Sequence, residues 1–275
     1  MIELNKLCKD NGDTVVGRQA IVLAQKLNYK RGIAQALNNI GVIYYKQQKG
    51  RTALDNHFQA LAIRQGLGNK KDISASYTNI GNSYDLLGDK KQAIEFHRKS
   101  LEIKVELKDT LGMARSLNNI ASAYNDIPDY YKVIEYGFKA VNLFQAMGDT
   151  SDNYAQVLNN IGLAYEHLEG FDKSLEYYHK ALSIYRELED DAGIAQMLNN
   201  MGNVYLLQGQ KAKGIFESAN KFQSALQNYF KALDILIKTD DKYLTAVVYN
   251  NIGNVYWELN KIGRASCRER VCQYV

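Results

Sequence analysis

Apolar side chains recur along the chain with the spacing of amphipathic helices. Leu37, Ile40 and Tyr44 lie three and four positions apart, and after a polar stretch Ala53 and Ala60 lie seven apart. Side chains at these intervals share one face of an α-helix, whereas a strand would alternate apolar and polar positions. The pattern therefore predicts pairs of helices joined by polar turns, and hence an all-α protein.

A short motif repeats through most of the sequence. Six copies of a string close to Asn-Asn-Ile-Gly begin at Asn38, Thr78, Asn118, Asn159, Asn199 and Asn250, and a tyrosine follows each copy at the same distance. Successive copies are 40 or 41 residues apart, except for a final interval of 51 residues. A two-helix unit cannot bury its apolar face alone, so such units stack on one another. The repetition predicts a solenoid of two-helix repeats.

Glycines mark both turns and close contacts in this pattern. Short turns are predicted between the two helices of each repeat, for example at Leu87–Asp89 and Gln208–Gln210. The glycine of the motif is in mid-helix, where it costs about 1 kcal/mol relative to alanine, so we expect close helix packing there. The long interval holds extra residues near Lys211–Lys221, which should lengthen a turn or extend the second helix.

The order of small, aromatic and alanine positions resembles the tetratricopeptide repeat. These positions are Gly41, Tyr44, Ala53 and Ala60 in one repeat, and Gly81, Tyr84, Ala93 and Ser100 in the next. The long period is similar to that of kinesin light chains, Leu-Gly-Asn repeat adaptors and bacterial peptide-sensing regulators. This resemblance implies a right-handed superhelical solenoid whose first helices line a concave groove. It also implies a protein or peptide ligand, and no catalysis of its own.

The repeats are expected to fill residues 1–261. We expect a partial first repeat at 1–30, about five full repeats, and a partial last repeat from 243, with both ends of the array cut. Residues 262–275 have no counterpart in any repeat, and Ile262–Val271 match one reading frame of a common sequencing adapter. We therefore expect residues 262–275 to be non-native, the alternative being a native basic tail.

Composition narrows the possible functions. Charged residues make up 23% of the chain and the net charge is +4, without the clustered basicity of a nucleic-acid-binding protein. No apolar run approaches the roughly 20 residues that span a membrane. The three cysteines and four histidines show no metal-ligand spacing. We expect no cofactor, no metal, no nucleic acid and no membrane contact, and a cytoplasmic location.

A row of carboxamides is the main candidate for ligand binding. The second asparagine position of the six motif copies supplies Asn39, Asn79, Asn119, Asn160, Asn200 and Asn251. Each lies about 100° around the helix from the packed isoleucine, on the stripe that faces the groove in the tetratricopeptide family. A carboxamide has a donor and an acceptor and can bind the backbone of an extended peptide. Alternatively, these side chains bond neighbouring helices and only maintain the superhelix.

Ligand specificity should come from groove positions that differ between repeats. The other candidate peptide-binding residues are Asn82, Asp85, Arg115, Asp126, Glu166, Asn203 and Asn254. Acidic groups gather in the middle repeats, and the apolar residues Leu206, Leu207 and Trp257 come later. We expect a ligand with a basic residue near its centre and an apolar residue towards the C-terminal repeats. Trp257 could equally pack against a following repeat.

Two other functions remain open. The array could be the sensor portion of a truncated bacterial signalling protein, such as a histidine kinase or a transcription regulator. It could also form homo-oligomers, because terminal repeats without polar caps expose apolar faces that can pair end to end.

Overall fold

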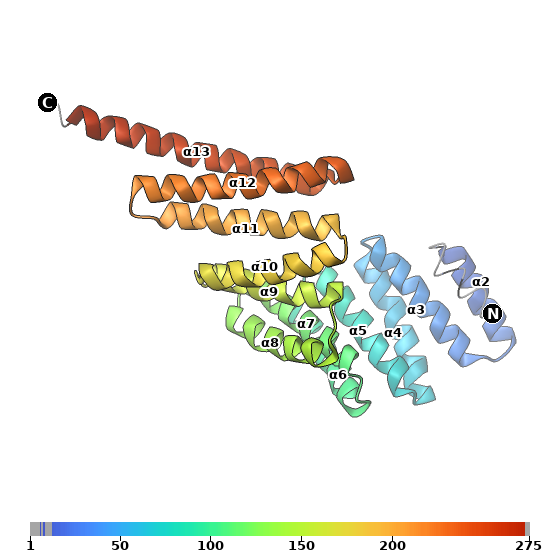
Figure 1. Cartoon of the computed structure of the whole chain (residues 1–275). Helices are drawn as coiled ribbons and strands as arrows, with labels where there is room; N and C mark the ends of the chain where they lie inside the picture. Colours follow the sequence, from blue (N-terminus) through green and yellow to red (C-terminus); the bar gives the residue numbers. More distant parts are fainter. Residues whose placement is uncertain (1–5, 7, 9–12, 273–275) are drawn as a thin grey trace. The chain divides into compact units, whose positions relative to one another are not determined.

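The computed structural model describes residues 6, 8 and 13–272, and side chains as far as residue 263. Every element in this part of the chain is a helix (Figure 1). The helices are α2 (Thr14–Lys26), α3 (Lys30–Lys46), α4 (Gly50–Leu67), α5 (Lys70–Leu86), α6 (Lys90–Glu106), α7 (Thr110–Asp126), α8 (Tyr130–Met147), α9 (Asp152–His167), α10 (Phe171–Glu187), α11 (Asp191–Lys211), α12 (Ile215–Thr239) and α13 (Lys242–Cys272). The prediction of an all-α repeat fold is confirmed.

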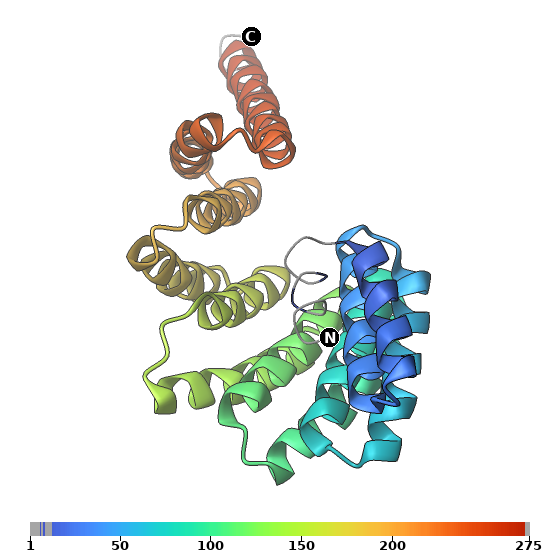
Figure 2. The same ribbon diagram turned by 90° about the vertical axis from the view of Figure 1, so that its right-hand side faces the viewer.

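The chain forms two compact units. The N-terminal unit comprises residues 1–147 with helices α2 to α8, and the C-terminal unit comprises residues 148–275 with helices α9 to α13. In each unit every helix packs on the next one along the chain (Figure 2). First helices of neighbouring repeats also touch. Helix α3 contacts α5, and α11 contacts both α9 and α13. The side chains of the asparagine motif therefore lie on neighbouring helices.

Side-chain caps set where several helices begin. Asp89, Asp109 and Asp190 each precede a helix, and each carboxylate accepts a hydrogen bond from the amide three residues later, at 3.1, 2.9 and 3.1 Å. Such bonds satisfy amides that have no partner within the helix. At the other end of a helix, Gly68 closes α4 with φ of 71°, a conformation that favours glycine. Local sequence thus sets the period of the repeat.

The motif glycine allows a ring of the second helix to pack directly on the first helix. A Cβ at Gly41 or Gly81 would lie 2.5 or 2.6 Å from the ring of His57 or His97. Tyrosine rings do the same at two later repeats, where Tyr178 covers Gly162 and Tyr229 covers Gly202. In the third repeat the sizes are exchanged, because Ala121 has replaced the glycine and Gly137 occupies the ring position. The close packing predicted at the motif glycine is confirmed.

Replacing Gly81 by alanine should destabilise the protein by about 1–3 kcal/mol, because the new methyl group must displace the His97 ring. Gly66→Ala provides the control, since a Cβ at Gly66 meets nothing within 4 Å. That substitution should be neutral or stabilise by up to about 1 kcal/mol. Urea unfolding followed by circular dichroism measures both. Equal stabilities for the two variants would contradict the packing explanation.

The extra residues of the long interval extend two helices. Helix α11 has 21 residues and α12 has 25, compared with 17 in α5 and α6. The predicted extension of the second helix is confirmed, but the predicted turn at Gln208–Gln210 is wrong. Gly209 lies buried inside α11, and a Cβ there would lie 2.5 Å from the Phe222 ring. This glycine serves close packing rather than a turn, and the chain turns between α11 and α12 instead.

Both expected ends of the array fall at the limits of the description. Residues 1–5, 7 and 9–12 lie outside the described residues, so the expected mid-helix start of the partial first repeat stays a prediction. At the other end, α13 runs without a break from Lys242 to Cys272, across the expected boundary at residue 261. The non-native origin of residues 262–275 also stays a prediction.

Candidate ligand-binding surface

The asparagines of the motif bond one repeat to the next within each unit. In the N-terminal unit, Asn79 Nδ2 donates to Asn38 Oδ1 at 2.8 Å. In the C-terminal unit, Asn200 Nδ2 donates to Asn159 Oδ1, and Asn251 Nδ2 to Asn199 Oδ1, each at 2.9 Å. The second asparagine of one repeat thus bonds the first asparagine of the preceding repeat. Part of this carboxamide row therefore serves the scaffold, as the alternative interpretation expected.

Two members of the row differ from this pattern. The second repeat has Thr78 in place of the first asparagine, and Asn119 Nδ2 instead donates to Asn82 Oδ1 at 3.4 Å. Asn39 is only 6% exposed, and its Oδ1 accepts a hydrogen bond from Gln35 Nε2 at 2.9 Å. Asn39 therefore does not have the exposed position that we expected, because its carboxamide is buried and bonded within α3.

The remaining members of the row keep partial exposure. Asn79, Asn119, Asn160, Asn200 and Asn251 are each half-buried. Among the described residues, Asn79 and Asn251 use their amide nitrogens in the bonds between repeats, whereas their carboxamide oxygens accept no hydrogen bond. A carboxamide oxygen can accept from a peptide N–H. The arrangement can therefore offer acceptors to an extended backbone while its donors are used by the scaffold.

The neighbouring asparagine candidates are partly used as acceptors. Asn203 Oδ1 accepts from the Tyr229 hydroxyl at 2.7 Å and from Asn251 Nδ2 at 3.2 Å. Asn254 is exposed on α13, and Arg115 is exposed on α7 one helical turn before Asn119. Asn203 therefore supports its neighbours, whereas Arg115 and Asn254 have exposed side chains.

Two of the three acidic candidates are already paired with a lysine of the chain. Lys90, the first residue of α6, places its Nζ 2.7 Å from Asp85 and 2.6 Å from Asp126. The lysine bridges two successive first helices, α5 and α7. Asp85 and Asp126 therefore share one internal cation, which compensates part of the negative charge that we expected to attract a basic ligand residue.

Glu166 has a different environment in the C-terminal unit. Its Oε2 accepts a hydrogen bond from the Tyr178 hydroxyl at 2.9 Å. Burial raises the pKa of the Glu166 carboxyl to about 7, although the Tyr178 hydrogen bond acts in the opposite direction. This carboxyl can change its protonation state near neutral pH.

The apolar candidates are distributed over α11 and α13. Leu206 and Leu207 are half-buried, whereas Trp257 is 60% exposed and its ring lies 3.2 Å from Lys261 Nζ. An exposed tryptophan provides a large contact area for a partner.

Two buried cations of the N-terminal unit were not among the predicted site residues. Arg64 is 5% exposed and donates through Nη1 to Ser76 Oγ at 2.8 Å and to Asn38 Oδ1 at 3.3 Å. Lys104 is 8% exposed and its Nζ donates to Ser116 Oγ at 2.8 Å and to Thr78 Oγ1 at 3.2 Å. These cations link a second helix to the first helices on both sides. Their burial lowers the pKa of each group.

A signal for these cations was present in the repeats. Each one is followed twelve residues later by the buried serine that it bonds. The corresponding pairs in the C-terminal unit contain no cation: Tyr185 with Met197, and Leu236 with Val248. A cation in the second helix thus occurs together with a serine in the next helix, whereas an uncharged side chain in the second helix occurs together with an apolar one. Comparing these two positions between repeats would have identified the contact between the cation and the serine.

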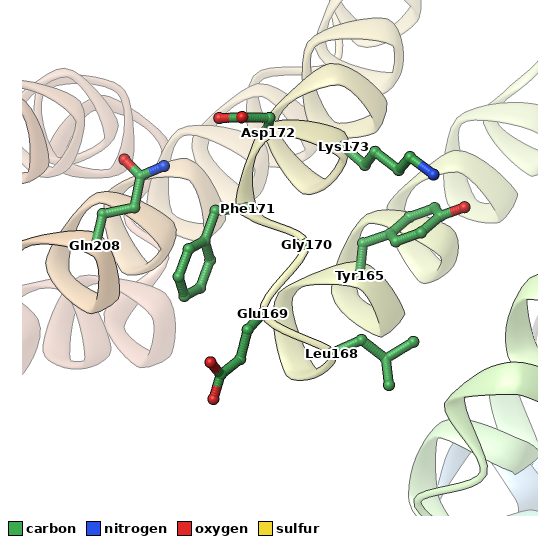
Figure 3. Close-up of a pocket in the computed structure, with 8 residues that line it drawn as sticks. All are labelled: Tyr165, Leu168, Glu169, Gly170, Phe171, Asp172, Lys173 and Gln208. Atoms are coloured by element: carbon green, nitrogen blue, oxygen red, sulfur yellow. The ribbon is translucent and has the colours of Figure 1, made fainter. Parts of the chain in front are cut away.

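A pocket lies beside the turn between α9 and α10 in the C-terminal unit (Figure 3). Its volume is about 570 Å³, and it is lined by Tyr165, Leu168, Glu169, Gly170, Phe171, Asp172, Lys173 and Gln208. Phe171 lies on the Gln208 side of Gly170 in Figure 3, with Tyr165 and Lys173 on the other side. Glu169 pairs with Lys211 at 2.5 Å. None of the predicted site residues lines this pocket, so it is separate from the carboxamide row.

Within the described residues, no group of three or more His, Cys, Asp or Glu side chains is placed to hold a metal ion. In the same part of the chain, no helix has the length and apolarity needed to cross a membrane.

Comparison with solved structures places the fold among known repeat proteins. The chain is similar to BtubC (BKLC) from P. vanneervenii, with a TM-score of 0.69 and 22% identity, over 83% of this chain and 91% of that one. It is also similar to a Rap protein complexed with competence and sporulation factor, with a TM-score of 0.59 and 16% identity, over 94% of this chain and 73% of that one. A STAND protein from Pyrococcus horikoshii with a tetratricopeptide repeat sensor has a TM-score of 0.61 and 12% identity, over 97% of this chain and 45% of that one.

Sequence comparison gives the family. No curated protein sequence matches significantly. The family model of the tetratricopeptide repeat matches residues 32–104 and 153–213, one segment in each unit. These segments hold four of the six copies of the asparagine motif with their glycines, and the rings of His57, His97 and Tyr178. Together with the stacked helix pairs, this match identifies residues 32–104 and 153–213 as tetratricopeptide repeats.

Proposed function

We propose that this protein is a non-catalytic scaffold that binds an extended protein or peptide segment along its first helices. The observation that carries the proposal is the carboxamide row, in which amide donors bond the preceding repeat while oxygens such as those of Asn79 and Asn251 keep their acceptor capacity. A row bonded in this way is held in place before a ligand arrives, which reduces the entropy lost on binding. The similarity to a Rap protein complexed with competence and sporulation factor supports a peptide as the ligand class.

The row alone should bind weakly. A hydrogen bond to a peptide backbone contributes about 0.5–1.5 kcal/mol net. Ordering ligand side chains costs a similar amount for each group. Neighbouring side chains that differ between repeats, such as Arg115, Glu166, Asn254 and Trp257, must therefore provide the selectivity. The exposed Trp257 ring on α13 suits an apolar ligand residue.

Asn200→Ala should weaken peptide binding about two- to tenfold, because it removes one carboxamide from the row. The probe is a peptide selected from a random twelve-residue display library on the wild-type protein, with affinity measured by calorimetry. Asn159→Ala is the matched control, since it removes the same bond between repeats but leaves the Asn200 side chain in place. Both variants should lose similar stability, whereas only Asn200→Ala should lose affinity. Equal losses of affinity would assign the row to the scaffold alone.

Self-association is a second candidate function, favoured by the outer face of α13. A Cβ at Gly253 would meet nothing within 4 Å, whereas Gly41, Gly81, Gly162 and Gly202 are each covered by a ring. On the same helix, Tyr249, Tyr256 and Trp257 are 54%, 54% and 60% exposed. Such a face can accept a helix of another copy. Light scattering of the full chain against concentration tests this, and a constant monomer mass would exclude it.

The sensor portion of a larger signalling protein is compatible with peptide binding. The similarity to a STAND protein with a tetratricopeptide repeat sensor supports this alternative. The complete open reading frame decides between a separate scaffold and the sensor portion of a larger protein. A kinase core or a DNA-binding domain in the same gene would favour the sensor.

A further inference from the structure

Glu166 lacks the internal cation that its equivalent in the second repeat, Asp85, possesses. Asp85 lies five residues before Lys90, the first residue of α6, and the two side chains form a salt bridge of 2.7 Å. Glu166 lies five residues before Phe171, the first residue of α10. A phenyl ring cannot compensate a carboxylate. The chain thus supplies a cation at this position in the second repeat and supplies none in the fourth.

The groups around Glu166 are polar but carry no positive charge. The Tyr178 hydroxyl from α10 donates to Oε2 at 2.9 Å. Tyr229 from α12 is close enough for the Glu166 charge to act on it, and its hydroxyl donates to Asn203 of α11 at 2.7 Å. Among the described residues, no lysine or arginine acts on the Glu166 carboxyl. The carboxylate is therefore partly desolvated, with one hydrogen bond and no ion pair.

A partly desolvated carboxylate without a cation is unfavourable, and this unfavourable state is relieved when a cation approaches. An opposite charge near such a group interacts more strongly than it would at a fully exposed carboxylate, because less water screens the pair. The Tyr178 hydroxyl occupies one oxygen and fixes the orientation of the carboxyl group. Oε1 accepts no hydrogen bond from the described residues.

We propose that Glu166 binds one cationic side chain, lysine or arginine, of the segment that the first helices hold. This inference rests on the proposed function and identifies the position of the basic ligand residue. Lys90 occupies the equivalent position in the N-terminal unit, so the ligand cation replaces a contact that the chain makes for itself elsewhere. The ligand cation is therefore expected at Glu166 of the C-terminal unit, whereas Asp85 and Asp126 already share Lys90.

The proposal predicts a specific pH dependence. A cation favours the ionised carboxylate, so binding releases the proton that Glu166 holds at lower pH. By linkage, affinity for the cation should rise between about pH 6 and about pH 8. A site without a titrating carboxyl would show no such rise over this range.

The test uses Nα-acetyl-L-arginine N-methylamide and its lysine counterpart as probes, with the citrulline compound as a neutral isostere. Binding to the full chain is followed by the carbon-13 carboxyl resonance of Glu166 and by amide resonances of α9 to α12. We expect saturable shifts with one or both cations and none with citrulline. Glu166→Gln should weaken cation binding at least about fivefold. The matched control is Glu176→Gln, which removes an exposed carboxylate paired with Lys180 on the outside of α10 and should leave binding unchanged.

The outcomes separate this inference from the proposed function. Absence of saturable binding up to about 50 mM, equal binding of citrulline, or unchanged binding by Glu166→Gln would overturn the cation site. The library peptides could still bind through Asn200 in that event, and the scaffold function would stand. Conversely, cation binding at Glu166 with no peptide captured from the library would support the site and contradict the scaffold function. Glu166→Gln should fold, because it removes a carboxyl whose ionisation is unfavourable and can keep the Tyr178 hydrogen bond.

Discussion

Acidification from about pH 7 to about pH 4 should destabilise the N-terminal unit by several kcal/mol through two histidines. His57 and His97 are 1% and 2% exposed, and each Nδ1 is buried without a hydrogen-bond partner among the described residues. Burial, with a smaller contribution from the neighbouring Arg64 or Lys104, lowers the pKa of each to about 4. The unfolded chain binds these protons below about pH 6.5, whereas the folded unit stays neutral to about pH 4. Stability is therefore full above pH 6.5 and falls as pH decreases, by roughly 3 kcal/mol for each histidine.

The C-terminal unit should respond in the opposite direction at Glu166. Its folded pKa of about 7 exceeds its unfolded value of 4.5, so the folded state binds the proton more tightly. This contribution improves stability as pH falls from about 7 to about 4.5. Hydrogen exchange measured by mass spectrometry at both pH values resolves the two units. Protection should fall in α3 to α6 more than in α9 to α12.

Substitution of His97 tests whether the buried histidines cause the acid sensitivity. His97→Tyr introduces the residue that later repeats use at this position, and Asn82 corresponds in sequence to the Asn203 that accepts from Tyr229. This variant should lose about half of the acid sensitivity of the N-terminal unit. His179→Tyr makes the same change at an exposed site of α10 and should leave the sensitivity unchanged. Identical pH profiles for wild type and His97→Tyr would contradict the assignment.

Ser116→Val should destabilise the protein by about 2–4 kcal/mol, because it leaves the buried Lys104 ammonium with Thr78 as its remaining hydrogen-bond acceptor. Adding Lys104→Leu should recover most of this loss. The double variant reproduces the Leu236 and Val248 pair that α12 and α13 already contain. Urea unfolding of the wild type, both single variants and the double variant measures the coupling free energy between positions 104 and 116.

We expect a coupling free energy of about 1–3 kcal/mol between the two positions. The comparison separates charge burial from packing, since an apolar pair of similar volume can replace a buried polar contact. Strictly additive effects of Ser116→Val and Lys104→Leu would show that the ammonium does not depend on the serine.

Much of the fold could be predicted because it depends on local spacing. The motif recurs in register, and the mid-helix glycines indicated close packing that the His57, His97, Tyr178 and Tyr229 rings provide. The turn at Gln208–Gln210 failed as a prediction because glycine serves either a turn or a close contact. Only the position of Phe222 against Gly209 distinguishes the two. The candidate site was less predictable, since its residues were placed by analogy between repeats.

The amino-acid sequence by itself determined the helix pairs, their order and the asparagine, glycine and ring positions, because each depends on residues close together in the chain. The tertiary structure decided which polar groups are already satisfied. Lys90 pairs with both Asp85 and Asp126, Asn38 and Asn159 accept hydrogen bonds from later asparagines, and Glu166 receives a hydroxyl hydrogen bond but no cation. These partners come from different helices, and burial sets the strength of each interaction. Helical periodicity can place a side chain on a face, but charge compensation depends on what the neighbouring helices bring to that face.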